Sequence, residues 1–304
     1  MNRSGLSRRL VLASMAAPVL PFVSGCAAPM PISLNPQTTP AAKALLHETA
    51  NAHGLAAYQA LRDVSVSYAG EWRALIGRIQ PAIVDAAFRS GSEERLLPHD
   101  GLIAQAHTGS GGRKQVMRRA AAASQGEVRV WFNGEEARDL ERRSAAAVVA
   151  DNYSVFLLGP LLLSDRLWAD RISGLELGGT EWVEEHECDV LRLLVSPGIG
   201  LSTQDQIALF VDRKERLTRR IRFTIDGFEG TRGAIAEVET FDHVTLHGVR
   251  WPTRFYERVV RPIKLPAHDW RLTGLDVNRG FQAAEIEGPV FTGAAAAPAA
   301  KLKA

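Results

Sequence analysis

Cysteine is nearly absent from this chain, since only Cys26 and Cys188 among its 304 residues carry a thiol. Two cysteines cannot build the set of bridges on which small secreted scaffolds depend, so a hydrophobic core has to hold the fold. Hydrophobic residues make up 46% of the sequence, which is enough for such a core. Cys188 lies in a segment with strand periodicity, and we expect it to be a small buried apolar side chain.

An excess of positive charge is also missing. Without its first 25 residues, which hold Arg3, Arg8 and Arg9, the chain keeps 33 of its 36 basic residues against 34 acidic ones. A nearly neutral chain lacks the basic surface with which proteins bind nucleic acid, so a nucleic-acid partner is excluded. The longest apolar run, Leu10–Val23, is shorter than the ~20 residues that a membrane span needs.

The sequence contains no catalytic signature. It lacks a Gly-x-Ser-x-Gly elbow, a His-Glu-x-x-His zinc motif, a phosphate-binding loop and a dinucleotide fingerprint. These absences favour a protein without enzymatic activity and without a cofactor or metal. The remaining candidate is a zinc site of His243 and His247 with Glu239 or Asp242, which would make the protein a metal-dependent hydrolase. Residues four apart on a strand lie ~13 Å apart, so we expect turn and edge histidines instead.

The N-terminus has the three parts of a secretory signal peptide. Arg8 and Arg9 precede the apolar run Leu10–Val23, and Ser24-Gly25-Cys26 follows it. This ending resembles the lipobox of bacterial lipoproteins, which implies cleavage after residue 25 and acylation of Cys26. The lipid would anchor the chain to a membrane, because each buried methylene contributes about 0.8 kcal/mol.

Two further features of the leader bear on export. Ser7-Arg8-Arg9-Leu10 resembles a twin-arginine signal, which leaves both the twin-arginine and the general secretory route open. Ala27, rather than Asp, follows the cysteine, and in a host with two membranes this implies an outer-membrane lipoprotein that faces the periplasm. In a host with one membrane, the anchor would lie in the cell membrane.

Composition divides the mature chain into three parts. Residues 26–40 contain four prolines and almost no charge, so we expect an extended tether that begins at lipidated Cys26. Residues 41–292 are expected to form a single domain. Residues 293–304 are rich in alanine and proline, and we expect them to be a disordered tail.

Two segments have helical periodicity. The first runs from Pro40 to about Ala60, with Thr39 as its N-cap and Pro40 in its first turn. The second runs from Arg142 to Leu163, and its Gly159-Pro160 pair is expected to break or kink the helix.

The remaining segments alternate between apolar and polar residues, which is the period of a β-strand. In residues 217–225, Ile221 and Phe223 share one face while Arg220 and Arg222 share the other. Asn133-Gly134 marks a hairpin turn. The links between strands are too short for crossover helices, so neighbouring strands are antiparallel. The strand candidates are residues 64–68, two segments within 95–118 around the loop 109–112, and residues 128–132, 182–187, 189–195, 207–211, 217–225, 234–244, 249–259 and 270–277.

This order of elements predicts a mainly β fold with some α: a large curved antiparallel sheet, or incomplete β-barrel, with about two helices covering its open side. The order resembles the LolA/LolB-like lipoprotein-localisation factors between residues 60 and 280. The segments that carry the resemblance are Gly179–Val183 with Cys188–Leu193, Leu209–Asp212 with Arg219–Phe223, and Val249–Thr253. The resemblance implies a hydrophobic cavity under a helical lid, and an acylated N-terminus is typical of the membrane-anchored branch of the group.

A half-open barrel that turns apolar side chains inward fills its interior either with its own helices or with a ligand. We expect an acyl chain, a lipoprotein or another apolar ligand to bind there, and we expect the protein to catalyse no reaction on it. The alternatives are a collapsed core, and a structural or protein-interaction module of the outer membrane that presents Trp72, Trp168 and Trp270 to a protein partner. The residues expected to line the cavity are Val130, Phe132, Tyr153, Phe156, Leu157, Leu193, Leu209, Ile221, Phe223, Phe241, Trp251 and Phe255.

On the other face of the sheet we expect Arg220 and Arg222 to pair across strands with Glu237 or Glu239. Exposed pairs of this kind contribute about 0.2–1 kcal/mol each. They predict a solvated sheet surface, and the alternative is a binding patch for acidic lipid headgroups.

Overall fold

The computed structural model describes residue 30 and residues 37–302. The signal peptide, the acylation of Cys26, most of the tether and the last two residues of the chain lie outside this range. In the described part, no helix is long and apolar enough to cross a membrane.

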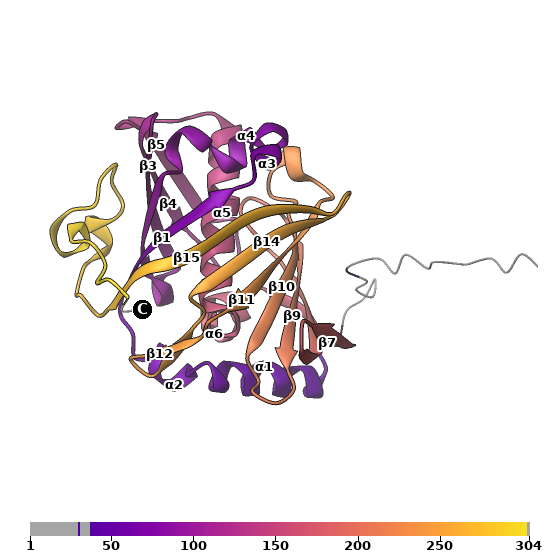
Figure 1. Cartoon of the computed structure of the whole chain (residues 1–304). Coiled ribbons are helices and arrows are strands. Elements are labelled where there is room, and N and C mark those ends of the chain that lie inside the picture. Colours follow the sequence, from indigo (N-terminus) through magenta and orange to yellow (C-terminus); the bar gives the residue numbers. More distant parts are fainter. Residues whose placement is uncertain (1–29, 31–36, 303–304) are drawn as a thin grey trace, which may run out of the picture.

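The fold is built on one open antiparallel sheet of thirteen strands (Figure 1). The strands are β1 (Val64–Trp72), β2 (Gly91–Leu97), β3 (Leu102–Gly109), β4 (Gly112–Arg119), β5 (Glu127–Phe132), β6 (Glu135–Glu136), β7 (Ile172–Val183), β8 (His186–Val195), β9 (Asp205–Asp212), β10 (Thr218–Thr224), β11 (Ile235–Phe241), β14 (Arg254–Arg261) and β15 (Leu265–Val277). Their order is β6-β5-β4-β3-β2-β1-β15-β14-β11-β10-β9-β8-β7, and the end strands do not close the sheet. The predicted fold class, an incomplete antiparallel barrel, is confirmed.

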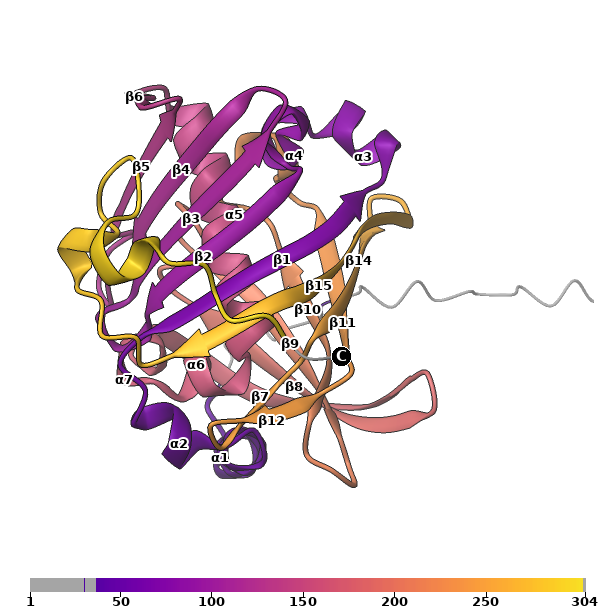
Figure 2. The ribbon, with the colours of Figure 1, turned by 60° about the vertical axis from the view of Figure 1, so that its left-hand side comes forward.

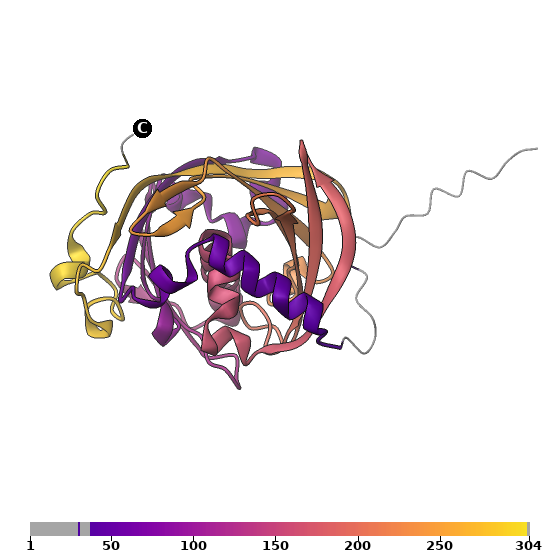
Figure 3. The same ribbon diagram turned by 90° about the horizontal axis from the view of Figure 1, so that it is seen from below.

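Helices lie inside the curved sheet and at its ends. Seen from below, the sheet surrounds the long helix α5 (Leu140–Leu158), and α1 (Pro40–Ala52) crosses the lower opening (Figure 3). At the opposite end lie α3 (Ala74–Ile79) and α4 (Pro81–Val84), as Figure 1 shows. Other short elements include the ribbon β12 (Val244–Leu246) with β13 (Val249–Trp251), and the 3₁₀ turns η1 (Ala86–Phe88), η2 (Pro98–Asp100) and η3 (Glu229–Thr231).

The first predicted helix is in fact two helices. α1 begins as expected, because the Thr39 side chain accepts a hydrogen bond from the Ala42 amide (3.2 Å) and Pro40 occupies the first turn. α2 (Leu55–Gln59) follows only after Gly54, whose φ is +93°. A Cβ at Gly54 would lie 2.2 Å from the carbonyl oxygen of Gly248, so the close approach of these two backbones requires glycine and ends α1.

The second predicted helix breaks at Gly159-Pro160, as expected. α5 ends before Gly159, and α6 (Pro160–Ser164) and α7 (Arg166–Ala169) follow. Every residue of α5 from Ser144 to Leu158 is buried. A helix without a solvent-facing side belongs in an interior, and α5 therefore fills the concave side of the sheet. Of the two predicted helices, only the first covers an opening.

The hydrophobic core lies between α5 and the concave face of the sheet. Ile221 and Phe223 of β10 point into it beside Leu209 of β9, with which Ile221 is paired in register. Phe255 and Trp270 stack with ring centroids 5.0 Å apart on neighbouring strands. Each fully buried side chain of this kind stabilises the fold by about 1.5–3 kcal/mol.

The C-terminal segment packs on the convex face of the sheet, over β2–β5 (Figure 2). It contains the 3₁₀ turns η4 (Ala283–Glu285) and η5 (Gly293–Ala296), and its Phe281 and Phe291 belong to a second buried cluster. The buried Arg95 side chain donates hydrogen bonds to the carbonyls of Ala295 (2.8 Å) and Ala297 (2.9 Å). Residues 293–302 are therefore ordered against the sheet instead of forming a tail, because their carbonyls satisfy an arginine, an interaction that composition does not reveal.

Turn residues set the strand boundaries. Asn133 and Gly134 form the predicted hairpin turn, with φ values of 52° and 88°. Residues 182–187 were expected to be one strand, but Glu184 and Glu185 form the turn between β7 and β8. Residues 249–259 are interrupted by Pro252, which has no amide to donate to a ladder.

Candidate functional site

The structure brings ten of the twelve predicted cavity residues into one buried cluster. They are Val130, Tyr153, Phe156, Leu157, Leu193, Leu209, Ile221, Phe223, Trp251 and Phe255. Phe132 packs against the edge of this cluster.

Phe241 is the exception among these residues. It is paired in register with Arg254, whose guanidinium lies 5.2 Å from its ring, on the convex side of the sheet. Residues two apart on a strand share a face. Phe241 therefore points the same way as Glu239, away from the interior.

The interior between these residues is filled. The Phe156 ring on α5 lies 5.1 Å from Phe223 and 5.9 Å from Trp270, and Tyr153 stacks on Trp270 at 5.4 Å. The spaces that the described residues leave beside Tyr153 and Phe156 measure about 20 Å³ and 10 Å³. Such spaces hold a water molecule at most, so this conformation has a collapsed core.

At the end of the interior near α3 and α4, the concave face becomes polar. Glu94 of β2 is paired in register with Gln105 of β3, and Ser92 of β2 with His107 of β3. Tyr68 of β1 lies beside Ser92 on the same face. The sequence contains a signal for this cluster, because strand alternation places Glu94 in phase with the buried Leu96.

The polar cluster lacks protein partners for several of its atoms. Gln105 donates a hydrogen bond to Oε1 of Glu94, and the Tyr153 hydroxyl lies 3.1 Å from Nδ1 of His268. Among the described residues, Oη of Tyr68, Oε2 of Glu94 and both ring nitrogens of His107 have no hydrogen-bond partner. Buried polar atoms are usually satisfied by protein or by ordered water, and the space of about 20 Å³ beside Tyr68 has room for water.

Burial keeps most titratable groups of this cluster uncharged. It raises the pKa of Glu94 to about 8 and that of Glu257 on β14 to about 7. It lowers the pKa of His107 and of His268 well below the usual value, and the positive charge of Arg89 adds to this effect. The cluster can therefore hold and exchange protons near neutral pH.

An open apolar groove lies at the lower end of the molecule, between α1 and the strands β7 and β8. Its volume is about 390 Å³, which is within the range of small-molecule sites. Ala41, Ala44 and Leu45 form the helix wall, and Leu177, which is half exposed, forms the strand wall. The main-chain hydrogen bond from Thr39 to the Leu175 carbonyl (3.0 Å) fixes α1 beside β7.

Charged side chains close one part of this groove. Arg216 forms ion pairs with Asp189 (3.0 Å) and with Glu48 (3.4 Å), and all three side chains line the groove. The register shift between Leu177 and Thr180 bulges β7 at Gly179, where a Cβ would meet no atom within 4 Å. The groove thus has apolar walls, an exposed glycine backbone at Gly179 and a rim of one arginine paired with two carboxylates.

The residues of the predicted zinc site do not come together. His243 is packed against His53, with ring centroids 5.8 Å apart, and burial lowers its pKa to about 3. His247 is exposed in the turn between β12 and β13. Residue 30 and residues 37–302 contain no group of three side chains suited to a metal ion.

The proposed tryptophan surface for a protein partner is not formed. Trp168 and Trp270 are buried, at 1% and 2% exposure, and Trp72 stacks on His268 at 4.1 Å. Cys188 is buried as expected, and burial raises the pKa of its thiol to about 11.

The predicted cross-strand pairs on the convex face are present. Arg220 contacts Glu239 (2.5 Å) and Arg222 contacts Glu237 (2.8 Å), while Arg258 bonds to both carboxylates. The surface is not solvated, however, because Glu237 and Glu239 are only 3% and 5% exposed. Arg258 and the close packing of these side chains cover the two carboxylates, which is why they are not exposed to solvent.

No family model matches the chain, and no curated protein matches it in sequence. Solved structures do match its fold. A DUF1329 family protein from Desulfovibrio piger is 12% identical with a TM-score of 0.49, and the match covers 81% of this chain and 97% of that one. A LolA superfamily protein from Nitrosomonas europaea is 11% identical with a TM-score of 0.41, and the match covers 81% of this chain and 96% of that one. The LolA group that the sequence resembles is thus also found among similar structures.

Proposed function

We propose that the chain is a lipid-anchored protein of the cell envelope, facing the periplasm from the outer membrane, that holds an acyl chain or another apolar ligand without chemistry. The observation that carries this proposal is the open apolar groove between α1 and β7. The ligand lies in this groove and not in the collapsed interior, where the predicted cavity residues already pack against α5.

The walls of the groove suit an unbranched hydrocarbon chain. Each methylene group that moves from water onto an apolar surface contributes about 0.8 kcal/mol of binding free energy. The ligand would also cover the half-exposed Leu177, and burying this side chain adds to the binding free energy. The ion pairs of Arg216 with Glu48 and Asp189 leave no net positive charge to demand an anionic ligand. Recognition therefore depends on apolar contact, and binding should tolerate different headgroups.

Titration with a fluorescent polyene fatty acid, whose emission rises in an apolar site, tests the groove. The Ala44→Trp variant places a bulky side chain in the groove, and we expect binding to weaken at least tenfold. Lys43→Trp changes the neighbouring exposed residue of the same helix outside the groove and should bind like the parent chain. Equal affinity of the two variants, or no binding by the parent, would contradict the proposal.

The membrane anchor requires a separate test. Growing cells that express the chain should incorporate radiolabelled palmitate into it, and the Cys26→Ala chain should remain unlabelled and unprocessed or become soluble. An unlabelled parent chain would refute lipid anchoring while leaving the groove experiment unaffected. Native mass spectrometry of the protein from envelope extracts then identifies the ligand by its mass.

A further inference from the structure

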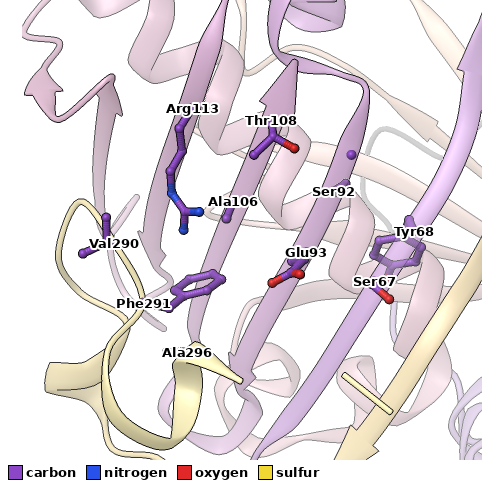
Figure 4. Close-up of a pocket in the computed structure, with 11 residues that line it drawn as sticks. Ser67, Tyr68, Ser92, Glu93, Ala106, Thr108, Arg113, Val290, Phe291 and Ala296 are labelled. Atoms are coloured by element: carbon purple, nitrogen blue, oxygen red, sulfur yellow. The ribbon is translucent and has the colours of Figure 1, made fainter. Parts of the chain in front are cut away.

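A second open pocket lies on the convex face of the sheet, away from α1. It measures about 460 Å³ between the strands β1–β4 and the C-terminal segment (Figure 4). Glu93, Ala106 and Arg113 line its floor, and Val290 and Phe291 form its wall. Ala106 and Phe291 belong to the second buried cluster, whereas Glu93, Arg113 and Val290 belong to neither a buried cluster nor the groove.

Small side chains make the floor of the pocket hollow. Ala106 of β3 lies between Glu93 of β2 and Gln115 of β4 in the register of the strands. The wall is held in place because the buried Arg95 guanidinium stacks on the Phe291 ring at 4.9 Å. Figure 4 shows the Arg113 side chain extending beside Ala106 toward this ring. The pocket is therefore held open by fixed side chains, and Ala106, Val290 and Phe291 give it an apolar centre.

Two neighbouring donors lack an acceptor, one on Arg113 in the floor and one on the buried Gln115, which lies beside the lining residues on β4. Nη2 of Arg113 donates a hydrogen bond to Oε1 of Gln115 (3.2 Å), which fixes the orientation of the amide. Among the described residues, Nε of Arg113 and Nε2 of Gln115 are buried atoms without a hydrogen-bond partner. Gln115 is only 1% exposed. Buried donors normally have a hydrogen-bond partner, so these two donors indicate an acceptor that the protein itself does not supply.

The charges of the pocket indicate what that acceptor is. The Glu93 carboxylate is paired with Arg95 (3.0 Å), so it is neutralised within the protein. Arg113 forms no salt bridge within the described part of the chain. We propose that this pocket binds an organic carboxylate with an apolar body: the carboxylate accepts from the Arg113 guanidinium, whose orientation Gln115 fixes, and the body packs on Ala106, Val290 and Phe291.

The experiment uses the full chain labelled with ¹⁵N and follows the arginine Nε–H resonances during titration with 3-phenylpropionate. We expect the Arg113 resonance to shift saturably at millimolar ligand. The matched amide, 3-phenylpropionamide, has the same body without the charge and should produce no saturable shift. If the parent chain does not respond to the carboxylate, or responds equally to the amide, the proposal is overturned.

Variants distinguish this site from other arginines. Arg113→Met should weaken binding about 10- to 100-fold, the usual effect of losing a hydrogen bond to a charged group. Arg129→Met removes an arginine from β5 on the same convex face, outside the pocket, and should leave affinity unchanged. Circular dichroism confirms that both variants fold. Loss of binding in both variants, or in neither, would refute the assignment, and neither outcome affects the fatty-acid experiment at the groove.

Discussion

Replacement of the buried Glu94 by glutamine should change how stability depends on pH. Burial raises the pKa of Glu94 in the folded chain to about 8, whereas the ordinary value is 4.5. The folded chain keeps this proton where the unfolded chain loses it, so the contribution to stability is complete below pH 4.5 and is lost as the pH rises through 8. Each pKa unit corresponds to about 1.4 kcal/mol, which gives a loss of about 3–4 kcal/mol between pH 5 and pH 8.

The Glu94→Gln chain should escape this loss. A glutamine amide keeps an oxygen that accepts the hydrogen bond from Gln105, and it does not ionise. We therefore expect urea unfolding to show a stability advantage of Glu94→Gln over the parent that grows by about 3–4 kcal/mol from pH 5 to pH 8. Glu257, whose pKa burial raises to about 7, also titrates in this range, but it is present in both chains.

Glu93→Gln is the matched control for this experiment. Glu93 precedes Glu94 on β2 but points to the convex face, where its side chain is 40% exposed. Its stability curve should run parallel to that of the parent chain. If the Glu94→Gln curve also runs parallel to the parent, Glu94 is ionised in the folded chain and the description of the polar cluster is wrong.

Three further changes have defined outcomes. Gly54→Ala should destabilise the fold by about 2–4 kcal/mol in urea unfolding, because the new Cβ collides with the Gly248 carbonyl; an unchanged midpoint would show that this contact relaxes freely. Asp151→Ala should cost about 3–5 kcal/mol, because it leaves the fully buried Arg118 without its carboxylate; a loss below 1 kcal/mol would show that water reaches the arginine. Cys188 should resist iodoacetamide at pH 8 in the folded chain and react in urea, because its thiol is buried and its pKa is raised to about 11; rapid labelling of folded protein would contradict its placement.

Local sequence signals predicted the strands because their physical causes are local. The alternation in residues 217–225 separates Ile221 and Phe223 from Arg220 and Arg222, and the structure places these pairs on opposite faces. Asn133-Gly134 turns the chain because these residues tolerate positive φ. Gly159-Pro160 ends a helix for an equally local reason.

The location of the helices and of the sites depends on contacts between distant segments. The run Ala145–Ala150 has no polar face, and this was the available signal that α5 lies inside the sheet and not on it. The groove exists only because α1 crosses β7, which is more than a hundred residues away in sequence. The convex pocket likewise requires the C-terminal segment to cover β2–β5, and its alanine-rich composition concealed the carbonyls that Arg95 binds.

The position of α5 favours the groove over the interior as the place for the proposed apolar ligand. Arg118 of β4 donates to both carboxylate oxygens of Asp151 on α5, at 3.0 Å and 2.8 Å. Asp151 also accepts from the amide of Gly200 (2.8 Å), so one buried ion pair ties the helix to the sheet and to the loop before β9. Withdrawing α5 would separate these charges in a dry interior at a cost of about 3–5 kcal/mol, in addition to exposing the aromatic residues that pack on Trp270. A ligand that enters the groove beside α1 disturbs neither interaction, and this difference favours the groove.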